Sequence, residues 1–372
     1  MNLCQRVDFQ VHSHHSDGGR APSDLIVRAH DINTDMRALA ITDHDRKGFY
    51  TQPGLGKLLE DTPGQIKRVQ NVSFSDGILC TETADIPPYD SNPAVYENGW
   101  PLLHYATVTP IGGSRYVREM YIVQACEITT FWRRHNCRVD LLAYFMPAED
   151  KFFDEAFAKQ EGPRRTRAKQ IVESVAESQN WNFTIADVDR VLWPARSIYR
   201  PHIAKAILNL RDRGTLCERG NGRKITLSPR IKIHEVIRRY IPDEICPKLD
   251  GVVLYDTEQA IKNLLEIRAV PVIPWSKDLD DPQLYQLVSD VHSWSDGMMG
   301  LEVWNARHLH TADVMRGLAQ AFNITTITAG SDYHGQEHDP PDRNHFGLLP
   351  TNGMPRDMLE RLIKLRLRIS SV

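Results

Sequence analysis

Two segments at opposite ends of the chain both combine histidine with aspartate. Residues 8–18 read Asp-Phe-Gln-Val-His-Ser-His-His-Ser-Asp-Gly, and residues 329–335 read Ala-Gly-Ser-Asp-Tyr-His-Gly. A third segment, Thr-Asp-His-Asp at residues 42–45, lies nearer the first. Imidazole and carboxylate groups together are typical ligands of zinc, manganese or iron at catalytic centres. Segments so far apart in the sequence form one site only if the fold brings the ends of several strands together.

Short apolar runs recur along the chain and end in polar residues that suit such a site. These runs lie at residues 37–41, 121–126, 139–145, 270–273, 300–304 and 325–329. Continuous apolar strands separated by helical stretches, such as the helix predicted at residues 22–30, favour a parallel sheet covered on both faces. Ligand-type residues after the strands favour an α/β barrel, because such barrels build their sites at the carboxyl ends of the strands.

Two segments interrupt this rhythm of strands and helices and indicate insertions. Residues 46–119 are rich in Gly, Pro, Asn and Tyr and poorly periodic, which predicts a loop-rich insertion with some local hairpins. Residues 150–268 follow a helical pattern and predict a helical insertion. We therefore expect residues 1–149 and 269–372 to form the two parts of the barrel.

Composition and charge narrow the range of partners. The formal net charge of −3 gives no electrostatic reason to expect long duplex nucleic acid or an anionic membrane as a partner. The basic run at residues 164–169 predicts a solvated helix face. The six cysteines include no Cys-x-x-Cys pair, and the sequence shows neither a signal-like N-terminus nor an apolar stretch long enough to span a bilayer. We therefore expect a cytoplasmic protein with free thiols.

The first segment predicts two metal ligands, His12 and Asp17. Side chains two apart on a strand share one face, so Gln10 and His12 both point toward the expected mouth of the barrel. Asp17 then lies in the turn that follows the strand. We expect His14 and His15 to lie on a solvated loop or to support the ligands rather than to bind metal.

Five motifs occur along the chain in an order that resembles a known family. They are His12 with Ser16-Asp17-Gly18, Thr42-Asp43-His44, Glu127 in Ala-Cys-Glu-Ile-Thr, Arg200-Pro201-His202, and Gly330-Ser331-Asp332-Tyr333-His334. The series is similar to the motifs of the polymerase-and-histidinol-phosphatase (PHP) family of metal-dependent phosphoesterases. This resemblance implies a distorted (β/α)7-type PHP barrel that holds two or three divalent ions of manganese, zinc or iron.

The resemblance also implies which residues would hold each ion. The first ion would take His12, Glu127 and Asp332. The second ion would take Asp17, His44 and His334. A third ion would share Glu127 and use His202.

Three residues depart from the family pattern. Gln10 and Asp140 stand where relatives often have histidine, and each still offers an oxygen that can bind metal. Trp275 stands where an Ala-His-Pro sequence is common, and its side chain cannot bind a metal in this way. The sequence is therefore compatible with a two-metal enzyme as well as with a three-metal one.

Through the resemblance, we expect a hydrolase that cleaves phosphate mono- or diesters with metal-activated water. The Arg-Pro-His element and the helical insertion resemble the branch acting on nucleotides and short single-stranded oligonucleotides, as phosphatase or nuclease. Candidates to clamp the phosphoryl oxygens are Arg200, Arg307 and Lys277. His308 or His334 would protonate the leaving oxygen, and the sequence does not choose between them.

Two other functions stay open. A catalytically degenerate barrel that serves as a binding or regulatory module is favoured by Gln10, Asp140 and Trp275, and opposed by the intact ligands of the other motifs. A metal-dependent amidohydrolase uses similar ligands, but it usually carries a metal-bridging lysine or an additional pair of strand-end histidines, and neither is placed correctly in this sequence.

Residues 290–297 resemble the first segment in sequence, but they precede a strand instead of following one. They therefore predict a loop or a helix end.

Overall fold

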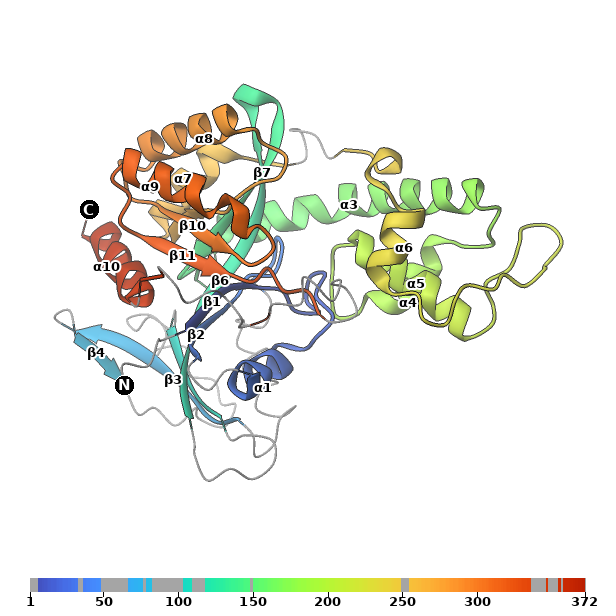
Figure 1. The fold of residues 1–372 in the computed structure, drawn as a ribbon, viewed down its shortest axis with the longest axis horizontal. Coiled ribbons are helices and arrows are strands. Elements are labelled where there is room, and N and C mark those ends of the chain that lie inside the picture. The colour runs from blue at the N-terminus through green and yellow to red at the C-terminus, as the bar shows by residue number, and fades with distance from the viewer. Residues whose placement is uncertain are drawn as a thin grey trace.

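The computed structural model describes residues 6–32, 36–47, 66–75, 78–81, 103–108, 118–147, 150–248, 254–335, 346, 354–355 and 357–371. Within these ranges a barrel-like sheet with its own helices adjoins a lobe of helices, and the long helix α3 runs from one to the other (Figure 1). Among the helices of these ranges, none is both long and apolar enough to cross a lipid bilayer.

In the part of the chain that the structure describes, seven strands form a nearly closed ring. In order around the ring they are β1 (Arg6–Val11), β2 (Met36–Ile41), β6 (Arg118–Trp132), β7 (Cys137–Tyr144), β9 (Val270–Ile273), β10 (Gly300–Asn305) and β11 (Ile327–Gly330). The ring closes where Val11 forms a bridge with Tyr333, and where the Asp332 amide donates to the Gln10 carbonyl at 2.8 Å. The expected α/β barrel is therefore confirmed, and its closure brings the first and last sequence segments together.

The strand β7 departs from the expected parallel arrangement. It pairs antiparallel with both β6 and β9, whereas β1, β2, β6, β10 and β11 pair in parallel with their other neighbours in the ring. The reason is the connection between β6 and β7, a short 3-10 turn at Arg133–His135 followed by Asn136 with φ 50°. A connection this short makes a hairpin, because parallel neighbours need a crossover of a dozen or more residues.

Part of the segment expected to be loop-rich forms antiparallel strands. These are β3 (Ile66–Ser75), β4 (Ile78–Thr81) and β5 (Leu103–Val108). β3 and β4 form a local hairpin of the kind expected, and β5 joins β3 to β6. Most of the remaining residues between 46 and 119 lie outside the described ranges.

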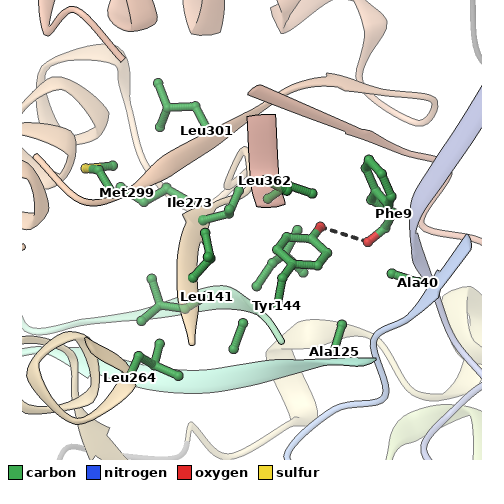
Figure 2. Packing of buried hydrophobic residues seen from close by; sticks show 14 of the residues in the cluster. Phe9, Ala40, Ala125, Leu141, Tyr144, Leu264, Ile273, Met299, Leu301 and Leu362 are labelled. Carbon is green, nitrogen blue, oxygen red and sulfur yellow. Dashed lines mark hydrogen bonds between the residues drawn. The ribbon is translucent and has the colours of Figure 1, made fainter. Parts of the chain in front are cut away.

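Within the described residues, five helices cover the barrel, namely α1 (Pro22–Ile32), α7 (Thr257–Glu266), α8 (Asp281–Trp294), α9 (Ala312–Ala321) and α10 (Met358–Ser370). The side chains of Leu141, Ile273, Leu301 and Leu362 meet in a common apolar core (Figure 2). In the same core the buried hydroxyl of Tyr144 donates to the Phe9 carbonyl at 2.8 Å, which satisfies its polar end (Figure 2).

Residues 290–297, whose sequence resembles that of the first segment, lie at the end of a helix, as predicted. α8 begins after Asp280, whose side chain accepts a hydrogen bond from the Gln283 amide at 2.8 Å. It ends at Trp294, and Asp296 and Gly297 follow with positive φ angles of 48° and 71°.

The helical lobe has a hydrophobic core of its own. It comprises α3 (Lys151–Ser178), α4 (Ile185–Leu192), α5 (Arg200–Asp212) and α6 (Ile233–Tyr240). Ile171, Val175 and Ile207, from the apolar stripes seen in the sequence, are buried there. The barrel resumes with the short strand β8 (Tyr255–Asp256), which pairs with β6, and with α7, which packs into the barrel core. These two elements come before residue 268, where the helical insertion was expected to end.

One basic residue at the start of the lobe is buried, although the sequence predicted a solvated face. Arg164 forms an ion pair with the equally buried Asp45, which follows β2. Its neighbour Arg165 is exposed and binds Asp189 through two hydrogen bonds of 2.6 and 2.7 Å. The helical repeat turns Arg164 toward the barrel while Arg165 faces outward, so the run of charges does not share one environment.

Candidate metal centre

The candidate ligands gather where the strands of the barrel end. His12 follows β1, His44 follows β2, and Asp332 follows β11. Glu127 lies within β6 and reaches the same place, because the backbone of His44 forms a bridge with that of Glu127. This is the edge of an α/β barrel at which active sites are built.

A first group consists of His12, Glu127 and Asp332, the residues expected to hold the first ion. The His12 Nε2 atom lies 3.1 Å from Glu127 Oε2 and 3.1 Å from Asp332 Oδ1. Asp332 has a φ of 51°, a left-handed conformation that aspartate tolerates better than most residues. Such strained backbone clusters at functional sites.

A second group consists of Asp17, His44 and His334, the residues expected to hold the second ion, together with His12. Asp17 oxygens lie 3.4 Å from His334 Nε2 and 3.9 Å from His44 Nε2. The ring of His12 stacks between the other two imidazoles, with centroid distances of 4.6 Å to His44 and 4.2 Å to His334. Two groups of ligand atoms therefore share one compact centre.

A third group consists of His44, Glu127 and Asp140. Asp140 Oδ2 accepts a hydrogen bond from Arg138 at 2.7 Å, and its Oδ1 is buried without a hydrogen-bond partner among the described residues. His202, expected at a third ion, is not part of this group.

His202 is fixed by its own helix. Its Nδ1 accepts a hydrogen bond from the Tyr199 amide at 3.0 Å, at the start of α5. Burial lowers the pKa of His202 to about 4, so its ring is neutral near pH 7. In a neutral imidazole only one ring nitrogen has a lone pair that can accept a hydrogen bond or bind a metal. In His202 that nitrogen is Nδ1, and it already accepts the hydrogen bond from Tyr199.

Gln10 on β1 connects Glu127 on β6 to Asn305 at the end of β10. Its Nε2 donates to Glu127 Oε2 at 3.0 Å, and its Oε1 accepts from Asn305 Nδ2 at 3.1 Å. The Asn305 amide also donates to the buried carboxyl of Glu302 at 2.9 Å. Burial raises the pKa of Glu302 well above its usual value. Sequence reasoning missed Asn305 and Glu302, although both lie in the apolar run at 300–304 or directly after it.

The aspartate of Thr42-Asp43-His44 anchors the loop that carries Asp17. Asp43 accepts hydrogen bonds from the Ser13 amide at 2.8 Å and from the hydroxyls of Ser13 and Ser16, both at 2.6 Å. Asp43 therefore holds the turn between His12 and Asp17 in place. Asp43 was part of the motif in the sequence, but its structural role is seen only from these hydrogen bonds.

Glycine is required where β11 passes β1. A Cβ atom at Gly330 would overlap Gln10 and the Glu302 carboxyl group. The absence of a side chain lets β11 approach closely enough to place Asp332 beside His12.

The donor set fits a divalent cation. Both ring nitrogens of His12 are buried, and neither makes a hydrogen bond of good geometry within the described residues. Instead, carboxylate oxygens surround the ring, with Glu127 and Asp332 each 3.1 Å from Nε2. Ligand atoms bound at about 2.1 Å from one ion lie roughly 3.0–3.4 Å apart, which matches these separations. Nitrogen and carboxylate ligands suit zinc, manganese and iron.

The electrostatics of the centre keep the carboxylates of Asp17 and Asp332 ionised. Burial opposes protonation of His12, but the carboxylates of Asp332 and Glu127 outweigh it and raise the pKa of His12 well above its usual value. Burial likewise opposes ionisation of Asp17, yet His334 and the other imidazoles hold the pKa of Asp17 well below its usual range. Ionised carboxylates are the form in which aspartate and glutamate bind cations.

Among the three candidates for the phosphate clamp, Arg200, Arg307 and Lys277, it is Arg307 that contacts the candidate ligands. Its Nε lies 3.2 Å from Asp332 Oδ2, and its Nη2 lies 2.7 Å from His334 Nδ1. Burial opposes ionisation of Asp332, and the charge of Arg307 overcomes it and lowers the pKa of that carboxyl. The ring of His308 packs against Trp275, with centroids 4.1 Å apart. Arg200 forms an ion pair with Asp243 in the helical lobe.

Comparisons with known proteins bear on the fold. The sequence matches no protein-family model and no curated protein. A solved chain from Bifidobacterium adolescentis, described as a metal-dependent phosphoesterase, matches with a TM-score of 0.60 and 19% identity, over 97% of this chain and 96% of that one. An amidohydrolase from Chromobacterium violaceum, solved with bound sulfate, matches with a TM-score of 0.55 and 17% identity, over 91% of this chain and 93% of that one. At these identities the likeness shows a shared fold along nearly the whole chain.

Proposed function

We propose that this protein is a metal-dependent phosphoesterase of the PHP type, which hydrolyses phosphate mono- or diesters. The observation that carries the proposal is the position of the His12 Nε2 atom, 3.1 Å from both Glu127 and Asp332, at the carboxyl ends of the barrel strands. The fold shared with a protein described as a metal-dependent phosphoesterase supports it.

Two groups of residues would hold the ions. His12, Glu127 and Asp332 would bind one, and Asp17, His44 and His334 the other, with Glu127 near both. Divalent ions bound there would polarise phosphoryl oxygens and make water a stronger nucleophile at neutral pH. Asp140 lies with His44 and Glu127 and is the residue best placed to serve a third ion.

Other residues of the chain would orient the metal ligands and neutralise the charge of the phosphoryl oxygens. Arg307 holds Asp332 and His334 in place and offers positive charge beside them, where phosphoryl oxygens would lie. His308 follows Arg307 directly and is fixed by Trp275, so its ring is a candidate to protonate the leaving oxygen. Arg200 is committed to Asp243, which makes it a weaker candidate for the phosphate clamp.

We infer that the substrate is a nucleotide or a short oligonucleotide. The motif order and the helical lobe support this inference. We also propose that residues 1–149 and the residues from β8 onward make the barrel and that the helical insertion lies between them, so the insertion ends before residue 268. The separate hydrophobic core of α3 to α6 supports this division, with the return to the barrel at β8.

The test is a substrate panel with added manganese. Purified protein would be incubated with 4-nitrophenyl phosphate, nucleoside monophosphates, nucleoside bisphosphates and short oligonucleotides, and release of phosphate or mononucleotide would be measured. Metal-dependent release that chelation abolishes supports the proposal. Metal binding without hydrolysis of any phosphate ester contradicts it and favours a binding or regulatory module instead.

One observation favours that second candidate. Both polar atoms of Gln10 are used in hydrogen bonds, so the position where relatives carry a first histidine offers no unoccupied ligand atom. A third possibility is an amidohydrolase-type reaction. Hydrolysis of amide or carboxylic ester substrates that lack phosphate would distinguish it from both the phosphoesterase and the binding module.

A further inference from the structure

A cavity adjoins the metal centre on the side of the helical lobe. Its volume is about 230 Å³, and its wall includes His44, Arg46 and Tyr199. The Tyr199 hydroxyl donates to the His44 carbonyl at 3.1 Å, so one wall of the cavity is tied directly to a candidate ligand. Pockets for whole small molecules measure about 300–1,000 Å³, so this cavity suits one substituent of a substrate.

Most charges around the cavity are neutralised by a partner. Lys47 is buried and lies 2.7 Å from Asp154 Oδ1. Arg196 lies 4.0 Å from Glu161. Asp45 forms its ion pair with Arg164, behind the cavity wall.

Arg46 is the exception. Its Nη1 donates to the carbonyl of Pro194 at 2.6 Å and to that of His15 at 3.4 Å, and it forms no ion pair with a carboxylate within the described residues. Asp43 is close enough for its charge to act on Arg46, but both of its oxygens are bonded to Ser13 and Ser16.

The partners of Arg46 leave part of its guanidinium group available. Carbonyl groups occupy Nη1, while Nε and Nη2 make no hydrogen bond within the described residues. A guanidinium group presents its N–H groups as a planar fork that matches phosphate and carboxylate. The side chain is partly buried, so water screens its charge less than on an open surface.

We propose that this cavity is an anion subsite in which Arg46 binds a second negatively charged group of the substrate, either phosphate or carboxylate. The proposal rests on the proposed function and sharpens it. The substrate becomes a phosphate ester whose reacting phosphate lies at the metal centre while a second anionic group lies at Arg46. Phosphate esters without that group are then poorer substrates.

The test compares substrates that differ only in the second group. Alkyl phosphates, ω-carboxyalkyl phosphates and α,ω-alkanediol bisphosphates of equal chain length would be hydrolysed by the manganese-loaded protein. In Arg46→Met, kcat/KM for one or both two-anion series is expected to fall about 10- to 100-fold, mainly through KM, while kcat/KM for alkyl phosphates stays unchanged. The series that responds identifies the anion. An equal loss on all three series, or no loss on either two-anion series, overturns the proposal.

A matched control tests whether Arg46 serves only to hold the lobe. Arg167 also donates to a main-chain carbonyl, that of Pro247 at 2.5 Å, but it does not line the cavity. Arg167→Met is therefore expected to leave the preference for two-anion substrates unchanged. If Arg46→Met does not fold, Arg46→Lys replaces it, because an ammonium group keeps the charge but loses the fork, and a smaller drop confined to the two-anion series is expected. A drop spread over all substrates would count against the subsite.

A binding measurement keeps this proposal separate from the proposed function. A non-hydrolysable α,ω-alkane bisphosphonate would be titrated calorimetrically into manganese-loaded wild type, Arg46→Met and Arg167→Met. If no phosphate ester is hydrolysed, the proposed function fails, and weaker binding confined to the Arg46 variant still supports the subsite. Equal binding by all three proteins overturns the subsite whatever the activity.

Discussion

Gln10 donates a hydrogen bond to Glu127 across the barrel, with 3.0 Å between Nε2 and Oε2, while its Oε1 accepts from Asn305 at 3.1 Å. The amide is buried and both of its polar atoms are used. This geometry favours a role for Gln10 in orienting Glu127 over the ligand role expected from its position in the motif.

Replacing Gln10 with leucine should therefore weaken metal binding without removing a ligand. Loss of a hydrogen bond that orients a ligand typically costs about 10- to 100-fold in metal affinity. The measurement is calorimetric titration of manganese into wild type and Gln10→Leu.

Gln124→Leu is the matched control for this prediction. Gln124 is also a buried glutamine, on β6, but its Nε2 has no hydrogen-bond partner within the described residues. Its replacement should leave manganese affinity within about 3-fold of wild type, well short of the effect of losing a bond to a ligand. Equal affinity in the Gln10 variant and wild type would show that the Gln10–Glu127 bond does not matter to the site.

The sequence predicted those parts of the fold that depend on local pattern. Apolar runs at residues 37–41, 270–273 and 300–304 form β2, β9 and β10, because buried strands read as continuous apolar stretches. The antiparallel direction of β7 was missed, because strand direction depends on the connection between Trp132 and Cys137 and not on the apolar pattern of either strand.

Within the site, the sequence indicated residue types but not pairwise contacts. His12, Glu127 and Asp332 were grouped from motif order, and the structure places them together. Asn305 gave no signal, because its position only becomes meaningful when the closed ring brings the end of β10 within reach of Gln10 on β1. Arg164 was misread for a similar reason, since its burial depends on how α3 meets the loop after β2.

The ion pair between Arg165 and Asp189 should make stability depend on pH in the acid range. Two hydrogen bonds from Arg165 lower the pKa of Asp189 in the folded protein below its usual value of 3.8. The unfolded state then binds more protons in that window, so the contribution is fully present above about pH 4 and is lost as pH falls through the folded-state pKa. The pair is exposed, so the contribution should stay below about 1 kcal/mol.

Urea unfolding of wild type and Asp189→Asn checks this expectation. The difference in free energy of unfolding should be present near pH 7 and shrink on acidification toward pH 3. Glu173→Gln is the control, because its pair with Lys169 lies on one helix at 3.8 Å and lacks the two-bond geometry. A difference that grows on acidification would mean that folding raises the pKa of Asp189, which contradicts a stabilising bond from Arg165.

Gly330→Ala should destabilise the barrel where the first and last strands meet. The added methyl group would overlap Gln10 and the Glu302 carboxyl, and overpacking of this kind costs about 1–3 kcal/mol. Gly317→Ala is the matched control, since a Cβ there meets nothing within 4 Å inside α9. That change should stabilise the protein by about 0.5–1 kcal/mol, because alanine favours the helix. Thermal unfolding of both variants measures the two effects, and a shift of the same sign in both would refute the packing argument.

Asp17 and Asp296 offer a comparison between two copies of the same short sequence. Ser16-Asp17-Gly18 lies in the centre, where Asp17 is 3.4 Å from His334, whereas Ser295-Asp296-Gly297 follows α8 and Asp296 is exposed. Asp17→Asn removes a charge that the ions would need, so hydrolysis of 4-nitrophenyl phosphate and manganese content should both fall, the rate by at least about 100-fold.

Asp296→Asn should leave both readouts unchanged, since asparagine tolerates the φ of 48° at that position as aspartate does. Circular dichroism and the melting temperature would establish that both variants fold. Full activity in Asp17→Asn with metal bound would remove Asp17 from the ligand set. A comparable loss in Asp296→Asn would show that the effect does not come from the metal centre, because that residue lies at a helix end outside the described ligand groups.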